Sequence, residues 1–183
     1  MTVLTKPRMT VDEFLAWAKD KPGRYELYRG EVLPMSPESI GHIKAKGAVY
    51  TALLAAARDS GRPCHVLTDG ATVRVDAATA YEPDALVYCG QELTLSDLEV
   101  SNPMVVVEVL SPSTCQFDAS IKLAGYFRLP SVAHYLIVAP TEPMIVHHSR
   151  GPGDDIITRV VTEGTIALDP PGLELAVADI YGA

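Results

Sequence analysis

The sequence predicts an α/β fold built on a mixed sheet that is flanked by helices, with additional antiparallel hairpins. Two observations support this. Apolar runs typical of buried strands, above all 104–110 and 133–138, alternate along the chain with helical segments. Shorter segments of alternating polarity have the pattern of hairpin strands. Because 183 residues show no repeat and no linker, we expect one domain, residues 1–183.

The first helices are predicted from their ends. Thr10 and Glu13 form a capping box that begins a short amphipathic helix, which we expect to end near Pro22-Gly23. An Ala-rich helix is expected from about Ser39 to Ser60, ended by Gly61, with Lys44, Lys46 and Arg58 among its outer residues. Further strands are expected over 25–28, 31–33, 65–67, 71–75, 82–88, 144–148 and 156–161, a surface excursion over 91–102, and a last turn or short helix over 173–180.

Composition restricts the function classes. The formal net charge is −8, so the chain has no global electrostatic attraction for nucleic acid, and DNA binding would need a local basic patch or a metal bridge. No apolar run reaches the length of a membrane span, and the N-terminus lacks the apolar core of a signal peptide. Cys64, Cys89 and Cys115 suggest neither a zinc site nor a disulfide framework, so we expect a cytoplasmic protein.

Two carboxylates lie inside strongly apolar strands. Glu108 is the single polar residue of the run 104–110, near its carboxyl end, and Asp84 is embedded in the run 83–88. A buried carboxylate is costly unless it is paired or binds a metal. Two of them converging from neighbouring strands would suit Mg²⁺ or Mn²⁺. The alternative is that Asp84 caps a turn and Glu108 pairs with a buried Arg or Lys.

A helix is expected to follow the Glu108 strand, opened by a second capping box at 113–116 and running to about Leu129. Asp118, Lys122 and Tyr126 recur at intervals of four, so they share one face of this helix. Folding back over the strand end would bring Lys122 towards Glu108. The alternative is an ordinary Asp–Lys surface pair, worth about 0.3–0.5 kcal/mol.

Other titratable residues leave their roles open. Glu26 is a third acid in a buried-looking strand, Glu31 a weaker candidate, and His42 opens the long helix from which it could reach a cleft. A single His there is more often a plain surface residue. His147 and His148 are adjacent on one predicted strand, so they point to opposite faces and make no two-His metal site. The sequence has no GxGxxG, P-loop or G-x-S-x-G motif.

Together these motifs resemble the Uma-two family of bacterial restriction-endonuclease-like proteins, in the PD-(D/E)XK nuclease superfamily. The resemblance runs from about Met9 to Val146. It rests on Tyr25-Glu26-Leu27-x-x-Gly30-Glu31, Met35-Ser36-Pro37, His42, Pro83-Asp84, Val107-Glu108-Val109-Leu110-Ser111-Pro112-Ser113-Thr114, Asp118-x-x-x-Lys122-x-x-x-Tyr126 and Tyr135-Leu136.

The resemblance implies a restriction-endonuclease-like core in which Asp84 and Glu108 hold Mg²⁺ or Mn²⁺, joined by Glu26 and the backbone carbonyl of Val109. Leu110 stands where the superfamily has its Lys, and Lys122 on the following helix matches the family's displaced Lys. The implied activity is Mg²⁺-dependent endonucleolytic hydrolysis of DNA phosphodiester bonds, by a homodimer. The rivals are a non-catalytic binding or regulatory module that retains the fold, and a metal-dependent hydrolase of a small phosphorylated substrate.

Overall fold

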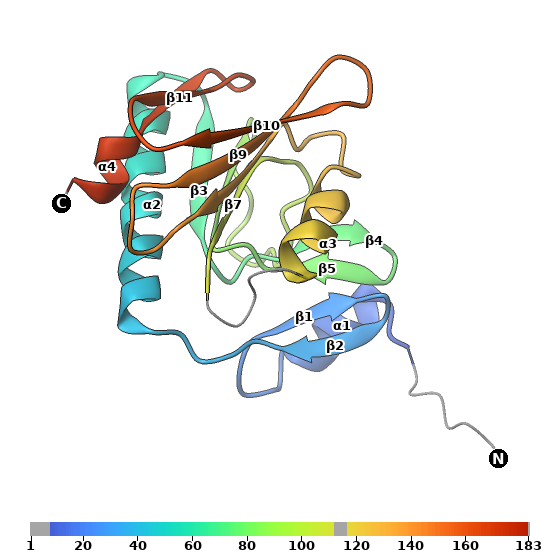
Figure 1. The fold of residues 1–183 in the computed structure, drawn as a ribbon. Helices are drawn as coiled ribbons and strands as arrows, with labels where there is room; N and C mark the ends of the chain where they lie inside the picture. The colour runs from blue at the N-terminus through green and yellow to red at the C-terminus, as the bar shows by residue number, and fades with distance from the viewer. Residues whose placement is uncertain (1–7, 112–116, 183) are drawn as a thin grey trace.

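The computed structural model describes residues 8–111 and 117–182, and a six-stranded mixed sheet forms its centre (Figure 1). The strand order is β10-β9-β8-β7-β6-β3. The chain passes through helix α3 between β7 and β8, which pair in parallel; the other neighbours in this sheet are antiparallel. The mixed sheet confirms the predicted fold class. Its strands are β3 (Cys64–Thr68), β6 (Ala85–Cys89), β7 (Pro103–Val109), β8 (His134–Val138), β9 (Ile145–Arg150) and β10 (Ile156–Val161).

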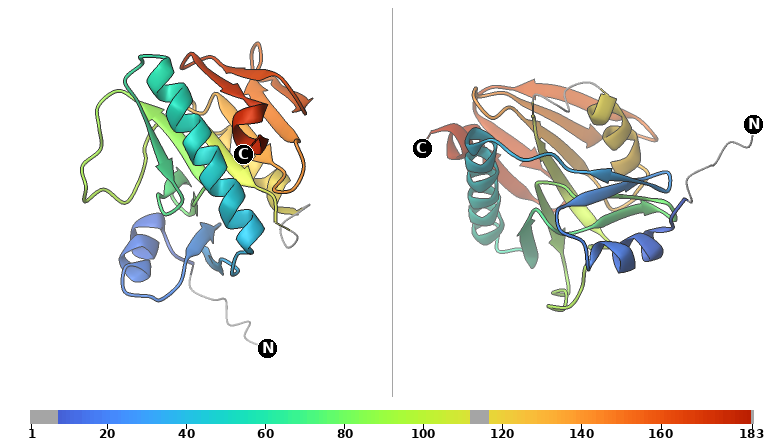
Figure 2. Two further views of the ribbon diagram at one scale, coloured as in Figure 1. Left: turned by 90° about the vertical axis from the view of Figure 1, so that its left-hand side faces the viewer. Right: turned by 90° about the horizontal axis from the view of Figure 1, so that it is seen from below.

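One face of this sheet is covered by α2 (Ile40–Asp59), which crosses it diagonally (Figure 2). The helix begins at Ser39, whose hydroxyl accepts the backbone N–H of His42 at 3.2 Å, and it ends before Gly61, as predicted. Val49 and Leu53 on its inner side are fully buried against the sheet. The same core includes side chains of α4 (Val177–Tyr181), β11 (Thr165–Leu168) and β12 (Leu173–Ala176).

A second layer covers part of the opposite face. A small sheet of order β2-β1-β5-β4 lies beside α3 in Figure 1, and a separate core joins Tyr126 of α3 to Val106 and Tyr135 of the central sheet. The β1–β2 hairpin turns at Arg29 and Gly30, both with left-handed φ (51° and 81°), which Gly adopts without strain. The elements are α1 (Val11–Ala18), β1 (Tyr25–Tyr28), β2 (Glu31–Pro34), β4 (Val73–Asp76), β5 (Thr79–Tyr81) and α3 (Phe117–Tyr126).

Helix α3 approaches the small sheet closely because of a glycine. A Cβ added at Gly125 would lie 2.6 Å from the Tyr81 ring of β5, nearer than side chains pack. The Tyr81 ring also meets that of Tyr126 edge-on, with centroids 5.3 Å apart. This packing fixes the height of α3 above the sheet, and with it the place of Lys122 one turn earlier.

Some predictions about the fold are wrong. Residues 79–81 and 165–168 form strands β5 and β11 where no strand was expected. In the segment 173–180 the predicted short helix is confirmed as α4 from Val177, but residues 173–176 form strand β12. Lys46 was assigned to the outer side of α2, yet only 6% of it is exposed. The capping box at 113–116 lies outside the described residues, so it remains a prediction.

The prediction that the cysteines form no disulfide is also wrong. Cys64 and Cys89 are joined, with sulfurs 2.03 Å apart. They are direct partners in the antiparallel β3–β6 register. That register is set by the whole sheet, so the spacing of the cysteines along the chain does not reveal it. Cys115 lies outside the described residues.

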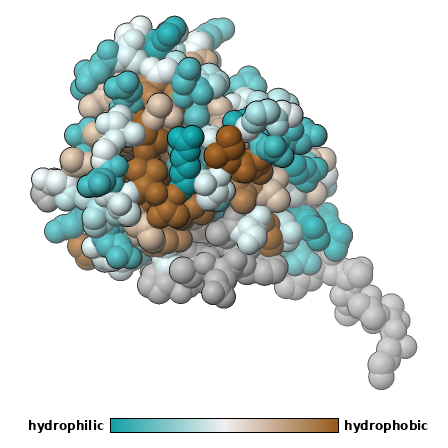
Figure 3. Space-filling view, turned by 45° about the horizontal axis from the view of Figure 1, so that its top comes forward, coloured by the Kyte–Doolittle hydropathy of each residue, from teal (hydrophilic) through white to brown (hydrophobic). Residues whose placement is uncertain are grey.

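Within the described residues, no helix is both long and apolar enough to cross a membrane. Several large apolar side chains are exposed, and Figure 3 shows apolar patches lying among hydrophilic side chains on one face of the molecule. Those near the beginning of α2 are Leu33, Ile40 and Ile43, with exposed fractions of 43%, 70% and 48%.

Candidate active site

A pocket of about 560 Å³ opens at the carboxyl end of β7, between the central sheet, strand β2 and the beginning of α2. Ligands collect at the carboxyl ends of parallel strands in open α/β sheets, and β7 and β8 form the parallel pair here. Apolar side chains make much of its lining, including Leu33, Met35, Leu110 and Ile137. Charged side chains from five separate segments line it as well.

Asp84 and Glu108 come together because of strand register. Ala85 of β6 pairs with Val107 of β7, so Asp84, one residue before, stands opposite Glu108 on the same sheet face. Asp84 is 4% exposed, and its Oδ2 accepts the backbone N–H of Val109 at 2.7 Å. The predicted neighbouring strands are therefore confirmed, and both carboxylates line the pocket.

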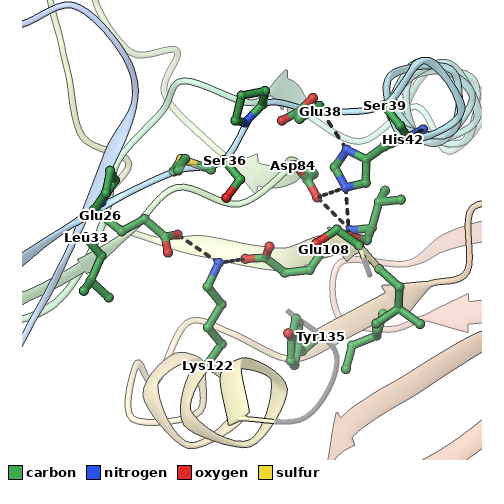
Figure 4. Close-up of a pocket in the computed structure, with 17 residues that line it drawn as sticks. Glu26, Leu33, Ser36, Glu38, Ser39, His42, Asp84, Glu108, Lys122 and Tyr135 are labelled. Carbon is green, nitrogen blue, oxygen red and sulfur yellow. Dashed lines mark hydrogen bonds and ion pairs between the residues drawn. The ribbon is translucent and has the colours of Figure 1, made fainter. Parts of the chain in front are cut away.

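Lys122 reaches the same place from α3. Its Nζ lies 2.9 Å from Oε1 of Glu26 and 3.0 Å from Oε1 of Glu108 (Figure 4). Glu108 Oε1 also accepts the hydroxyl hydrogen of Tyr126 at 2.8 Å. The predicted approach of Lys122 to Glu108 is confirmed, and the shared helix face of Lys122 and Tyr126 proves to be the face that holds Glu108. The side chain of Asp118 lies outside the described residues.

Glu26 comes from β1 of the small sheet, so the site joins two sheets. Its Oε1 accepts the backbone N–H of Glu82 at 2.9 Å, in addition to the contact with Lys122. Only 8% of Glu26 is exposed. Glu31, the weaker candidate, is exposed on β2 and does not line the pocket.

A second charged group, which the sequence reasoning missed, adjoins these carboxylates. Lys46 Nζ lies 2.6 Å from both Glu38 Oε2 and Asp69 Oδ2, and 3.6 Å from Asp84 Oδ1. Arg24 contacts Glu38 at 3.0 Å and Asp69 at 2.6 Å. The available signal was the interval of four between positions 38, 42 and 46, of which 42 and 46 share one face of α2 and Glu38 stands just before the helix.

Burial sets the protonation of the carboxylates. It raises the pKa of Glu108 to about 8; Lys122 opposes this rise, and the nearby charges of Glu26 and Asp84 add to it. Burial also raises the pKa of Asp84, against the lowering effects of the Val109 N–H, His42 and Lys46. The cations present therefore do not fully offset the cost of burying these carboxylates.

The donors fit a divalent metal ion. Carboxylate and carbonyl oxygens are the ligands that Mg²⁺ and Mn²⁺ take in proteins, and Asp84, Glu108 and the Val109 carbonyl supply them at one end of the pocket. Ligand atoms of Glu38, His42 and Asp84 also lie within 4.8 Å of one another. An added cation would favour the ionised form of Glu108, which burial alone disfavours.

The family model described as "Putative restriction endonuclease" matches residues 11–178. The chain belongs to this family, Uma2. The match covers both the small sheet and the central sheet, so it includes every residue of the pocket.

Two relatives and one solved structure are similar to most of the chain. "Uncharacterized protein slr1290" of Synechocystis sp. (strain ATCC 27184 / PCC 6803 / Kazusa) is 28% identical over 96% of this chain and 92% of its own. "Uncharacterized protein sll1609" of the same strain is 24% identical over 82% of this chain and 85% of its own. A structure titled "putative nuclease belonging to DUF820 from Anabaena variabilis ATCC 29413" covers 95% of this chain and 98% of its own at a TM-score of 0.71, with 14% identity. This last likeness shows a shared fold.

Proposed function

We propose that this Uma2 protein is an endonuclease that hydrolyses DNA phosphodiester bonds with a bound Mg²⁺ or Mn²⁺. The observation that carries the proposal is the convergence of three carboxylates, Glu26, Asp84 and Glu108, at the end of β7. Lys122 pairs with Glu26 and Glu108, and Lys46 lies 3.6 Å from Asp84. The family and the fold support a nuclease-like role. Asp84, Glu108 and the Val109 carbonyl would hold the cation, with Glu26 at its side.

Each residue has a task that its contacts suggest. When bound, the cation would polarise the scissile phosphate and lower the pKa of the attacking water. Lys122 would orient that water or stabilise the negative charge that builds on phosphorus, since its ammonium lies at hydrogen-bond distance from Glu108. Tyr126 fixes Glu108 in place, and Glu26 fixes Lys122.

DNA as the substrate requires local attraction, because the net charge is −8. The bound cation and Lys122 would supply it inside the pocket. Two copies of the chain would place two such sites on a duplex, so we propose that the active form is a homodimer that cuts both strands.

One observation favours a second function, a non-catalytic module that retains the fold. Lys122 is already paired with both Glu26 and Glu108, so its ammonium group can neutralise these carboxylates in place of the metal ion that a nuclease needs. A pocket of about 560 Å³ with apolar walls also suits a small phosphorylated substrate. One assay distinguishes both of these alternatives from the proposed endonuclease.

The assay follows conversion of supercoiled plasmid to nicked and linear forms with saturating Mn²⁺. We expect cleavage by the parent and none by Asp84→Asn, which removes a proposed metal-binding charge while keeping the shape. Asp154→Asn is the matched control, because Asp154 is exposed in the β9–β10 loop. A parent that binds Mn²⁺ but leaves every DNA form intact would contradict the proposal. Hydrolysis of bis(p-nitrophenyl) phosphate alone would then favour the small-substrate enzyme, and no hydrolysis would favour the module.

A further inference from the structure

His42 is buried, although a histidine at the beginning of a helix is more often exposed at the surface. It lies in the first turn of α2 with its ring turned inward, and only 8% of the residue is exposed. Its Nε2 is 2.9 Å from the carbonyl oxygen of Val109 and 3.8 Å from Oδ2 of Asp84 (Figure 4). Both of these oxygens belong to the proposed metal site.

Both ring nitrogens of His42 have neighbouring oxygen atoms that accept hydrogen bonds. A carbonyl oxygen accepts but does not donate, so Nε2 must carry the hydrogen when it bonds to Val109. In the neutral ring Nδ1 then holds a lone pair, and its nearest charged neighbour is Oε2 of Glu38 at 3.5 Å. Within the described residues, this buried nitrogen has no hydrogen-bond partner.

In the neutral ring the lone pair of Nδ1 thus faces the carboxylate of Glu38, which is unfavourable. A cation bound to Nε2 removes this unfavourable contact, because the lone pair then lies on Nε2 and the hydrogen on Nδ1 points to the Glu38 carboxylate. Metal-binding histidines usually donate their other ring N–H to such a carboxylate, which fixes the tautomer. Glu38 is itself held by Lys46 at 2.6 Å and by Arg24 at 3.0 Å, so its position is set before any cation arrives.

One donor spacing agrees, that between His42 Nε2 and the Val109 carbonyl oxygen, whereas Asp84 Oδ2 lies farther away, 3.8 Å from Nε2. Adjacent ligands of an octahedral ion lie about 3 Å apart when each bond is about 2.1 Å long. The separation between His42 Nε2 and the Val109 oxygen is 2.9 Å. The imidazolium form of His42, which donates from both nitrogens, is the other arrangement that satisfies the ring, and it would bind no metal.

We propose that His42 is a nitrogen ligand of the divalent cation, oriented by Glu38, and that it shifts the preference of the site from Mg²⁺ towards first-row transition metals. The inference rests on the proposed function, since it assumes a cation at Asp84 and Glu108. Oxygen-only sites suit Mg²⁺, whereas an imidazole ligand favours transition metals. Co²⁺ should therefore bind more tightly than Mn²⁺, and Mn²⁺ more tightly than Mg²⁺.

The test detects the nitrogen directly. Pulsed electron paramagnetic resonance of the Mn²⁺-loaded parent should show ¹⁴N coupling, which becomes ¹⁵N coupling when the histidines are ¹⁵N-labelled. His42→Gln should lose the coupling, because the amide can still donate to the Val109 carbonyl but offers no imidazole nitrogen. His65→Gln is the matched control: its ring also lies near a backbone carbonyl, 3.3 Å from that of Gly90, and outside the pocket.

Calorimetry then measures how the affinities for Co²⁺ and Mg²⁺ change. We expect His42→Gln to bind Co²⁺ 10- to 100-fold more weakly and Mg²⁺ nearly as well as the parent, so that the Co²⁺/Mg²⁺ affinity ratio falls. A parent that binds Mn²⁺ without nitrogen coupling overturns this inference and leaves the proposed function standing. A parent that binds neither Mn²⁺ nor Mg²⁺ overturns both. If His42→Gln fails to fold, the change from ¹⁴N to ¹⁵N coupling in the parent with labelled histidines still shows whether a histidine binds the metal.

Discussion

The two faces of the central sheet each bury a cluster of titratable side chains, and the clusters are built in opposite ways. On the face of α3, Glu26, Asp84 and Glu108 line a pocket, and Lys122 pairs with Glu26 and Glu108. On the face of α2, His134 and His147 form a buried pair, with His134 Nδ1 2.9 Å from His147 Nε2. The first will be called the carboxylate cluster and the second the histidine pair.

Burial shifts the pKa values of the two clusters in opposite directions. It lowers the pKa of His147 to about 4, helped by the charges of His134 and Arg159, so the histidine pair is neutral at pH 7 and its members bond to each other. In the carboxylate cluster burial raises the pKa of Glu108 to about 8, and Lys122, which opposes this rise, stands beside it in an open pocket. Titratable groups with shifted pKa values thus indicate a site when they converge and face a cavity.

The largest effect is expected from Glu108→Gln, which would make the carboxylate cluster resemble the neutral pair. We expect Mn²⁺ binding to be abolished, because an amide in place of a charged ligand holds a hard cation poorly. The metal-free variant should melt at a higher temperature than the parent, since burial disfavours the ionised form of Glu108 and a neutral amide avoids that cost. Calorimetry and thermal unfolding measure the two effects. Glu174→Gln, an exposed β12 position, is the control, and an unchanged Mn²⁺ affinity in Glu108→Gln would exclude Glu108 as a ligand.

Next in size is Lys122→Met, which separates charge stabilisation from metal binding. Because Lys122 contacts the carboxylates through its ammonium only, Met keeps much of the packing of the stem. Turnover of plasmid should fall on the order of 100- to 1000-fold with Mn²⁺ affinity nearly unchanged. Lys44→Met, exposed on α2, is the control in single-turnover assays. Equal rates for Lys122→Met and the parent would leave Lys122 a structural partner of Glu26 and Glu108.

These contacts show what the sequence could predict and what it could not. The apolar runs of β7 and β8, the ends of α2 and the helical spacing of Lys122 and Tyr126 are local signals, and each predicted its element or contact. Lys46 was misplaced because α2 itself consists largely of Ala and other small residues, so the helix shows no clear polar face. Strand β5 has three residues, too few for alternation, and the bond between Cys64 and Cys89 depends on a register set by the whole sheet.

The carboxylate cluster should also respond to pH in the alkaline direction. Metal binding must displace the proton of Glu108, whose pKa is about 8, so apparent Mn²⁺ affinity should rise with pH and level off above 8. Below that value the loss should approach about tenfold per pH unit for one displaced proton. Calorimetry at pH 6, 7 and 8 in buffers of different ionisation enthalpy counts the protons released. Affinity that is constant over this range, without proton release, would contradict the protonated state of Glu108.

The histidine pair should respond in the acidic direction, and more weakly. The pKa of His147 is lowered in the folded protein from 6.5 to about 4, so between these values the unfolded chain binds the extra proton. Stability is therefore present above pH 6.5 and is lost as pH falls towards 4, on the order of 2 kcal/mol. The charges of Arg159 and Asp169 also act on the pair, and His148, on the opposite face of the sheet, adds to the lowering at His147. Urea unfolding at pH 7 and pH 5 should show a smaller loss in His147→Gln than in the parent; an equal loss would assign the acid sensitivity elsewhere.

The central claim is that the carboxylate cluster holds a divalent cation, and a crystal soaked in Mn²⁺ tests it most directly. The anomalous difference map should show a peak in the pocket bonded to Asp84, Glu108 and the Val109 carbonyl, with the side chain of Lys122 beside it. A pocket without a peak at saturating Mn²⁺, in which Lys122 keeps its contacts of 2.9 Å with Glu26 and 3.0 Å with Glu108, would contradict the claim.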